Sequence, residues 1–191
     1  MNLPNKLTIL RIILVPFFMF FLLFPVFGDT VSRIVAAVIF ALTALTDLLD
    51  GKIARKYNLI TDFGKFLDPL ADKVMIISAF ISLMVIDRAE TGLVIALAIT
   101  TSLTVFRELA VSGLRLIVSS KANVVVAAAW LGKVKTVTQV VAVFVLLLEP
   151  VLLPFTNPYI SYVLLAATLV ITLWSGADYF RAYWKHIDPS K

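Results

Sequence analysis

Four aspartates lie close together in a chain that is otherwise strongly apolar. Asp47, Asp50, Asp68 and Asp72 fall in one short stretch of a sequence that is 61% hydrophobic and only 15% charged. A carboxylate at the centre of a membrane helix costs roughly 2.5–3.5 kcal/mol to insert. Four of them together therefore predict that a cation neutralises the cluster or that water reaches it, and a metal site satisfies this need most simply.

The composition limits which metal such a site can hold. The chain has no cysteine, and its single histidine, His186, lies near the end of the sequence. Thiolate and histidine-rich sites are therefore excluded, as is a cysteine nucleophile. Ligands that are all oxygens favour a hard ion such as Mg²⁺ or Mn²⁺.

Helical spacing brings the acids into pairs. Asp47 and Asp50 share one face of a helix, and Asp68 and Asp72 are four residues apart. A short turn at about 58–64 separates the two segments, which predicts antiparallel neighbouring helices with converging pairs. Two facing carboxylate pairs suit two metal ions about 3.5–4 Å apart, as used in phosphoryl transfer.

The elements that carry these residues are predicted to cross a membrane. The chain has 191 residues and a mean hydropathy of +1.00, and its charged fraction is well below the roughly 25% of soluble domains. We expect an all-α polytopic membrane protein, one domain over 1–191, with six transmembrane helices. The apolar runs place these helices at about 7–27, 33–56, 66–87, 92–118, 124–148 and 158–184.

Basic residues predict the orientation. Only Arg33 and Arg88 fall toward one end of the predicted spans, and fifteen others fall toward the opposite end. The positive-inside rule makes both termini cytoplasmic in a cell membrane, with the aspartates facing the cytoplasm. The net charge of +5 suits anionic lipid headgroups, and basic residues scattered among apolar runs argue against nucleic acid. The fifteen are Lys6, Arg11, Lys52, Arg55, Lys56, Lys65, Lys73, Arg107, Arg115, Lys121, Lys133, Lys135, Arg181, Lys185 and Lys191.

Small residues beside the first acid pair leave space on the helix. Gly51 and Ala54 remove side-chain bulk next to Asp50, so that a flat or phosphorylated group can approach the backbone. The alternative is a small-residue face for helix packing, which is common in membranes. Arg55 has two interpretations as well, because it can bind a diphosphate or anchor the helix end at the interface.

The complete pattern resembles the signature of the CDP-alcohol phosphotransferase family at all eight fixed positions: Asp47, Asp50, Gly51, Ala54, Arg55, Gly64, Asp68 and Asp72. The resemblance implies that an alcohol displaces CMP from a CDP-linked lipid with the help of two divalent metal ions, Mg²⁺ or Mn²⁺. It implies metal ligation by the four aspartates, with Asp72 also acting as the general base. It further implies a CDP pocket formed by Asp50, Gly51, Ala54, Arg55 and Gly64, and a homodimer.

Softer patterns resemble one branch of this family, the phosphatidylglycerophosphate synthases. They are the opening Asn2–Arg11 stretch, Arg107-Glu108 with the following Ser112–Arg115, and Gly132–Thr136. This implies transfer of the phosphatidyl group from CDP-diacylglycerol to sn-glycerol 3-phosphate, giving phosphatidylglycerophosphate and CMP. Independently, four cations at predicted cytoplasmic helix ends predict a phosphate-bearing acceptor, although snorkelling to lipid phosphates is the competing interpretation. These cations are Arg107, Arg115, Lys133 and Lys135.

Two other functions are compatible with parts of the sequence. A different member of the same family, forming inositol-phosphate lipids or cardiolipin, would share the eight positions. A membrane cation transporter would use its intramembrane acids as an ion path, but it would need inverted repeats or broken helices. The sequence shows no internal repeat, and the acids lie toward one end of the predicted spans.

Overall fold

Six α-helices make up the part of the chain that the computed structural model describes, namely residues 2–57, 59, 61–88, 90–122, 130–155 and 157–184. Within these ranges the side chains of Arg55, Lys65 and residues 119–122 are not described. The helices are α1 (Leu3–Leu23), α2 (Asp29–Lys56), α3 (Asp62–Ile86), α4 (Thr91–Ala122), α5 (Trp130–Leu152) and α6 (Tyr159–Tyr183).

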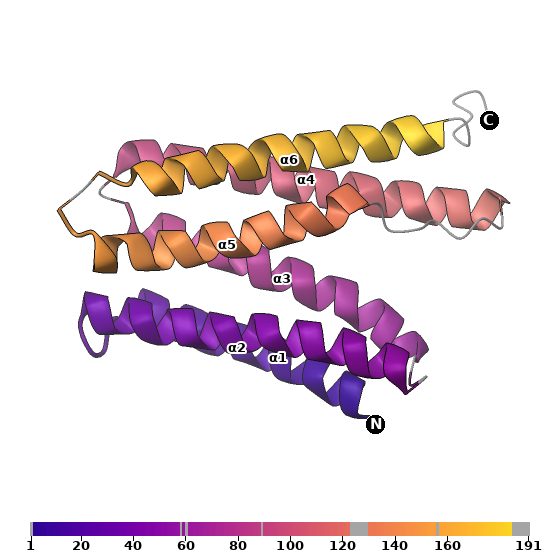
Figure 1. Cartoon of the computed structure of the whole chain (residues 1–191), viewed down its shortest axis with the longest axis horizontal. Helices are drawn as coiled ribbons and strands as arrows, with labels where there is room; N and C mark the ends of the chain where they lie inside the picture. The colour runs from indigo at the N-terminus through magenta and orange to yellow at the C-terminus, as the bar shows by residue number, and fades with distance from the viewer. Residues whose placement is uncertain are drawn as a thin grey trace.

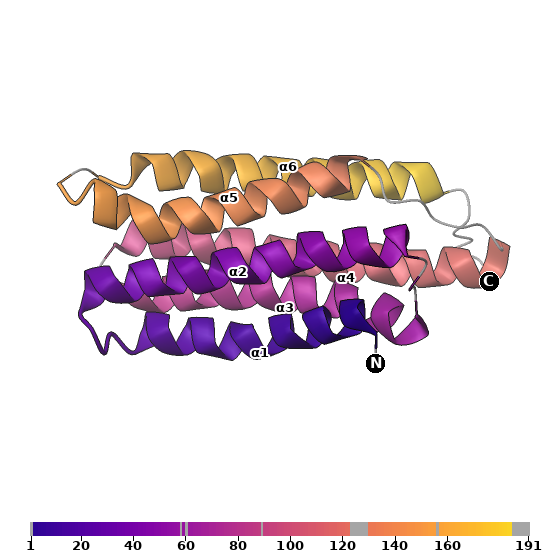
Figure 2. The same cartoon turned by 60° about the horizontal axis from the view of Figure 1, so that its bottom comes forward.

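All six helices run roughly along one long axis (Figure 1). The start of α1, the α2–α3 connection and the end of α6 lie at the same end of the bundle (Figure 1). Helix α1 packs against α2 and α3, while α6 packs against α4 and α5 (Figure 2). Contacts of α3 with α4 and of α2 with α5 join the two groups.

The outer surface confirms the predicted class of protein. Each of the six helices is long and apolar enough to cross a membrane, and large apolar side chains such as Phe17, Phe106 and Leu116 are exposed along the bundle. The apolar core lies between the helices, where Phe40 and Phe80 are fully buried among other apolar side chains. The all-α fold with six membrane-spanning helices is therefore as expected.

Local capping moves several helix ends from the predicted positions. The Asn2 side chain accepts a hydrogen bond from the Asn5 backbone, so that α1 begins at Leu3 instead of about 7. Thr61 caps α3 in the same way, which places Gly64 in the first turn of the helix instead of in the connection. Helix α2 begins directly after Gly28, whose φ of 84° suits glycine.

The fifth helix also differs from its predicted range. Helix α5 runs through Pro150 to Leu152, beyond the predicted end at 148. The first six residues of the predicted range, 124–129, lie outside the described part of the chain. A proline near the end of a helix removes only one backbone donor from a segment whose last carbonyls are already unpaired.

The expected contact between α2 and α3 is the main difference from the sequence-based prediction. These two helices barely touch each other, although a short connection joins them. Helix α1 instead packs extensively against both (Figure 2). The two aspartate pairs therefore meet across side chains of α1, which the spacing of the acids alone did not indicate.

Candidate active site

The four aspartates converge on one guanidinium group. Arg11 of α1 is completely buried, and its Nη1 atom lies 2.9 Å from Asp47 Oδ1 and 2.6 Å from Asp72 Oδ1. Its Nη2 atom pairs closely with Asp50 Oδ2. One cation thus contacts carboxylates of both α2 and α3 at the same time.

The fourth aspartate, Asp68, contacts the turn of α1 that precedes Arg11. The Thr8 hydroxyl donates a 2.7 Å hydrogen bond to Asp68 Oδ1 and lies 3.4 Å from Asp50 Oδ2. One turn earlier, the Asn5 side chain accepts a hydrogen bond from the Thr61 hydroxyl at the start of α3. A polar stripe along α1, Asn5, Thr8 and Arg11, therefore forms a third wall of the site.

The donor set fits divalent cations by chemistry and charge. Every ligating atom offered is a carboxylate oxygen, and Arg11 provides a single positive charge against four negative ones. Within the described ranges no three acidic side chains surround a common point that could hold a metal ion directly. The guanidinium explains this spacing, because it lies between the carboxylates of Asp47, Asp50 and Asp72. A hard cation with a preference for oxygen is the group that this excess negative charge favours.

The signature residues other than the aspartates occupy the same region. Gly51 and Ala54 are half-buried on α2. Gly51 directly follows Asp50, and Ala54 lies one helical turn further along. Gly64 is buried, and a Cβ atom there would lie 3.0 Å from the Asn5 side-chain oxygen. Close packing by α1 therefore favours a glycine at position 64. Arg55 belongs to α2, but its side chain lies outside the described part of the chain.

A second charged cluster is buried between α4, α5 and α6. The Glu108 carboxylate lies 2.9 Å from Arg107 Nη1 and pairs closely with Lys135 Nζ. Arg107 also donates a 2.6 Å hydrogen bond to the Ser175 hydroxyl of α6. Gly176 makes room for this arginine, since a Cβ atom there would lie 3.1 Å from Arg107 Cγ.

A small cavity connects the two clusters. Its volume is about 80 Å³, and its lining includes Asp72 from the first cluster and Glu108 and Lys135 from the second. Thr104 and Gln139, both buried, also line it. The lining also includes Lys73, so that two carboxylates and two lysines face this cavity, while Arg107 pairs with Glu108 without lining it.

The other two predicted phosphate-binding cations lie elsewhere. Arg115 lies two turns along α4 from Arg107 and donates a 3.2 Å hydrogen bond to the Tyr179 hydroxyl. Lys133 is exposed on α5. The structure therefore brings Arg107 and Lys135 together around Glu108, but not Arg115 or Lys133.

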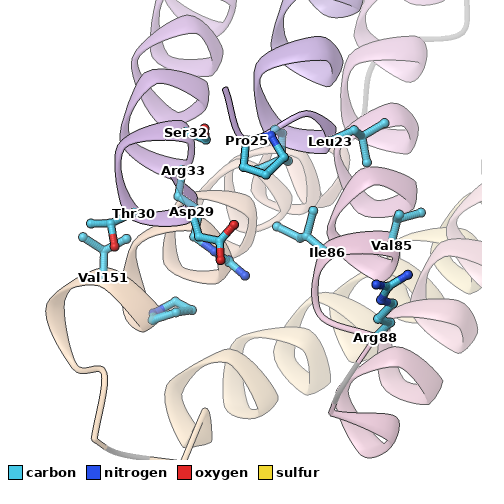
Figure 3. A pocket seen from close by; sticks show the side chains of 12 residues that line it. Leu23, Pro25, Asp29, Thr30, Ser32, Arg33, Val85, Ile86, Arg88 and Val151 are labelled. Carbon is cyan, nitrogen blue, oxygen red and sulfur yellow. The ribbon is translucent and has the colours of Figure 1, made fainter. Parts of the chain in front are cut away.

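A larger cavity lies at the opposite end of the bundle, away from both clusters. It measures about 520 Å³, and Asp29, Arg33 and Arg88 line it together with apolar side chains (Figure 3). Arg33 pairs with the buried carboxylate of Asp87 and donates to the carbonyl of Leu146. Burial raises the pKa of Asp87 above its ordinary value, and the Arg33 guanidinium opposes that rise. The Arg33–Asp87 ion pair is far along α2 from the aspartate cluster.

Arg11, Thr8 and Ser175 are polar residues of these clusters that the sequence did not identify as site residues. One signal for the first two was available: Asn5, Thr8 and Arg11 recur every three residues in an apolar run, which places them on one helix face. Ser175 had no comparable signal, because a lone serine in an apolar helix is common.

Comparison with known proteins agrees with the eight-position signature. The family model for CDP-alcohol phosphatidyltransferases matches residues 1–174. A Bacillus subtilis protein named CDP-diacylglycerol–glycerol-3-phosphate 3-phosphatidyltransferase is 41% identical, with 99% of this chain and 98% of that protein covered. An Escherichia coli protein of the same name is 38% identical, with 95% and 94% covered. A probable phosphatidylglycerophosphate synthase of Mycobacterium tuberculosis is also 38% identical, with 93% and 79% covered. The chain therefore belongs to the CDP-alcohol phosphatidyltransferase family.

Proposed function

We propose that this protein transfers the phosphatidyl group of CDP-diacylglycerol to sn-glycerol 3-phosphate, giving phosphatidylglycerophosphate and CMP. Membership of the family and relatives of this name at about 40% identity support the reaction. The observation that carries the choice of acceptor is the cavity shared by Asp72 and the Glu108–Lys135 pair. This cavity is lined both by a carboxylate that can accept a proton, Asp72, and by a cation that can bind a phosphate, Lys135.

The aspartates hold the metal ions in this proposal. Asp47, Asp50, Asp68 and Asp72 supply the oxygen ligands for two divalent cations, Mg²⁺ or Mn²⁺. When bound, such ions neutralise charge on the diphosphate and stabilise the departing CMP. Arg11 and Thr8 already orient all four carboxylates from the side of α1.

The CDP part of the lipid substrate binds along α2 and the start of α3. Gly51 and Ala54 let the nucleotide approach the α2 backbone beside Asp50, and Arg55 pairs with the diphosphate. Gly64 keeps the first turn of α3 close to α1, where Asn5 would collide with a larger side chain. The pocket is therefore shaped by small residues on two helices and closed by a third.

The acceptor enters the cavity between α3, α4 and α5. Its phosphate binds to Lys135 and Arg107, which Glu108 holds in place through short ionic contacts. Because that pair is oriented before the acceptor arrives, little side-chain entropy is lost on binding. Asp72, on the wall of the same cavity, accepts the proton of the attacking hydroxyl. Arg115 and Lys133 attract the anionic acceptor from further away.

The position in the membrane follows from the same proposal. The lipid substrate enters sideways from the bilayer, and the water-soluble acceptor arrives from the cytoplasm, where both termini lie according to the positive-inside rule. A homodimer in the cell membrane is the assembly that the family resemblance implies.

Release of CMP from CDP-diacylglycerol by the purified protein tests the proposal. Candidate acceptors are supplied one at a time, including sn-glycerol 3-phosphate, inositol phosphate and phosphatidylglycerol. We expect release with Mg²⁺ or Mn²⁺ and sn-glycerol 3-phosphate, and background release with the others. Release with inositol phosphate or phosphatidylglycerol, but none with sn-glycerol 3-phosphate, would assign the protein to another branch of the family.

A further inference from the structure

Arg11 is a fully buried arginine whose main partners are three aspartates. Its guanidinium divides its contacts, with Nη1 shared by Asp47 and Asp72 and Nη2 directed to Asp50. The third nitrogen, Nε, is buried and has no hydrogen-bond partner among the described residues. The group is therefore fixed by carboxylates from two other helices and not by its own helix.

Those carboxylates need a cation to stay together. Like charges at short range repel, and the repulsion is stronger where water is excluded. Helices α2 and α3 barely touch, so that little direct packing between them opposes this repulsion. Helix α1 packs against both and places Arg11 at the point where the carboxylates converge.

We infer that Arg11 is a positioning residue, a built-in cation of α1 that holds the aspartates of α2 and α3 in their converged arrangement. Metal ions that bind to the same aspartates are then thermodynamically linked to Arg11, because both neutralise one set of negative charges. The link to metal rests on the proposed function. The role of Arg11 in holding the carboxylates does not.

Arginine suits this role because of its geometry. The planar fork reaches several carboxylates at once, whereas the ammonium group of a lysine is a compact point charge. Arg11→Met keeps most of the side-chain volume and removes the charge. Compared with Arg11→Met, Arg11→Lys should therefore regain part of the lost stability, but it should not hold the aspartates in the same arrangement.

The first experiment measures thermal unfolding of the purified protein in excess chelator. Arg11→Met should lower the melting temperature by about 10 °C, because removal of one partner leaves buried charges uncompensated. The change in melting temperature caused by Asp50→Asn should be several degrees more positive in the Arg11→Met background than in the wild type. Without Arg11, the loss of the Asp50 charge relieves repulsion among the remaining carboxylates. Effects that add within about 2 °C would show that Arg11 is only a packing residue, and would overturn the inference.

The second experiment repeats the unfolding with increasing Mg²⁺. Metal should raise the melting temperature of Arg11→Met by more than that of the wild type, with Arg11→Lys in between. Arg33→Met is the control, because it removes a partly buried arginine paired with the buried Asp87 at the other end of α2. The control should lose stability but keep the wild-type response to Mg²⁺.

The possible results separate the two proposals. An equal Mg²⁺ response in Arg11→Met, Arg33→Met and the wild type would overturn the link between Arg11 and metal. If Mg²⁺ and Mn²⁺ shift none of the proteins, the proposed metal site fails. In that case the non-additivity of Arg11→Met and Asp50→Asn in chelator still decides the role of Arg11.

Discussion

Replacement of Lys135 by methionine is the most informative change at the proposed acceptor site. Lys135 is buried beside Glu108 and lines the cavity that also contains Asp72. Loss of one charge-assisted hydrogen bond to a phosphate costs on the order of 1.5–3 kcal/mol. We therefore expect Lys135→Met to raise the KM for sn-glycerol 3-phosphate by about 10- to 150-fold.

The structure also predicts that this variant folds. After the change, Glu108 keeps Arg107 as an ionic partner at 2.9 Å, so that no buried charge is left alone. Glu108→Gln is different, because it would leave two buried cations without their shared carboxylate. Lys135→Met should consequently be the more stable of the two variants in a thermal unfolding assay.

The assay is CMP release at saturating CDP-diacylglycerol with sn-glycerol 3-phosphate titrated, followed by the converse titration. Lys133→Met is the matched control, because Lys133 lies on the same helix but is exposed. It should change the acceptor KM by no more than about threefold, in keeping with long-range attraction. The reasoning is refuted if Lys135→Met leaves the acceptor KM within twofold of the wild type. An equal rise in both substrate KM values would instead mean that Lys135 supports the whole site.

Three further changes test other parts of the site. Asp72→Asn should lower kcat by about 10²- to 10⁴-fold through loss of the proton acceptor. Its effect on CDP-diacylglycerol binding, measured separately, should be smaller. Normal turnover of this variant at saturating substrate would place the base elsewhere. Gly64→Ala should cost about 1–3 kcal/mol in the free energy of unfolding, because its Cβ would lie 3.0 Å from Asn5, and an unchanged melting temperature would count against this contact. Chelation with EDTA should abolish CMP release and Mg²⁺ or Mn²⁺ should restore it, whereas full activity in excess chelator would exclude the proposed metals.

Much of the fold was predictable because membrane helices follow simple rules. Long apolar runs gave six helices of the right order and number. The helix ends were less accurate, since capping by Asn2 and Thr61 extended α1 and α3 by about one turn at their starts. Capping depends on one side chain, whereas hydropathy averages over many.

The site was predictable where spacing along one helix decides the outcome. Asp47 with Asp50, and Asp68 with Asp72, share helix faces because of their separation in sequence. The proximity of Arg107 and Lys135 could be expected only loosely, as both were placed at the same end of neighbouring spans. Their common partner Glu108 brings them together, and a contact between two helices is not encoded in the spacing within either one.

Helix α1 is the part of the site that the sequence pattern does not predict. Its polar residues resemble the opening of related proteins and add to the basic cytoplasmic end, but neither feature indicates a wall of the site. Yet a buried guanidinium in a membrane helix needs a carboxylate or several carbonyl groups as partners. Aspartates of α2 and α3 provide these partners for Arg11.

With the proposed metal site and the inferred role of Arg11, a balance of charge accounts for the third helix beside the two that carry the signature. Four carboxylates suit binding of metal ions but destabilise any protein that must fold before those ions arrive. One arginine on a third helix lowers that cost without removing the excess negative charge that attracts divalent cations. A second arginine in the same place would stabilise the apoprotein further, but it would weaken metal binding by neutralising more of the site. The single charge of Arg11, buried between α2 and α3, is a compromise between folding and the proposed chemistry.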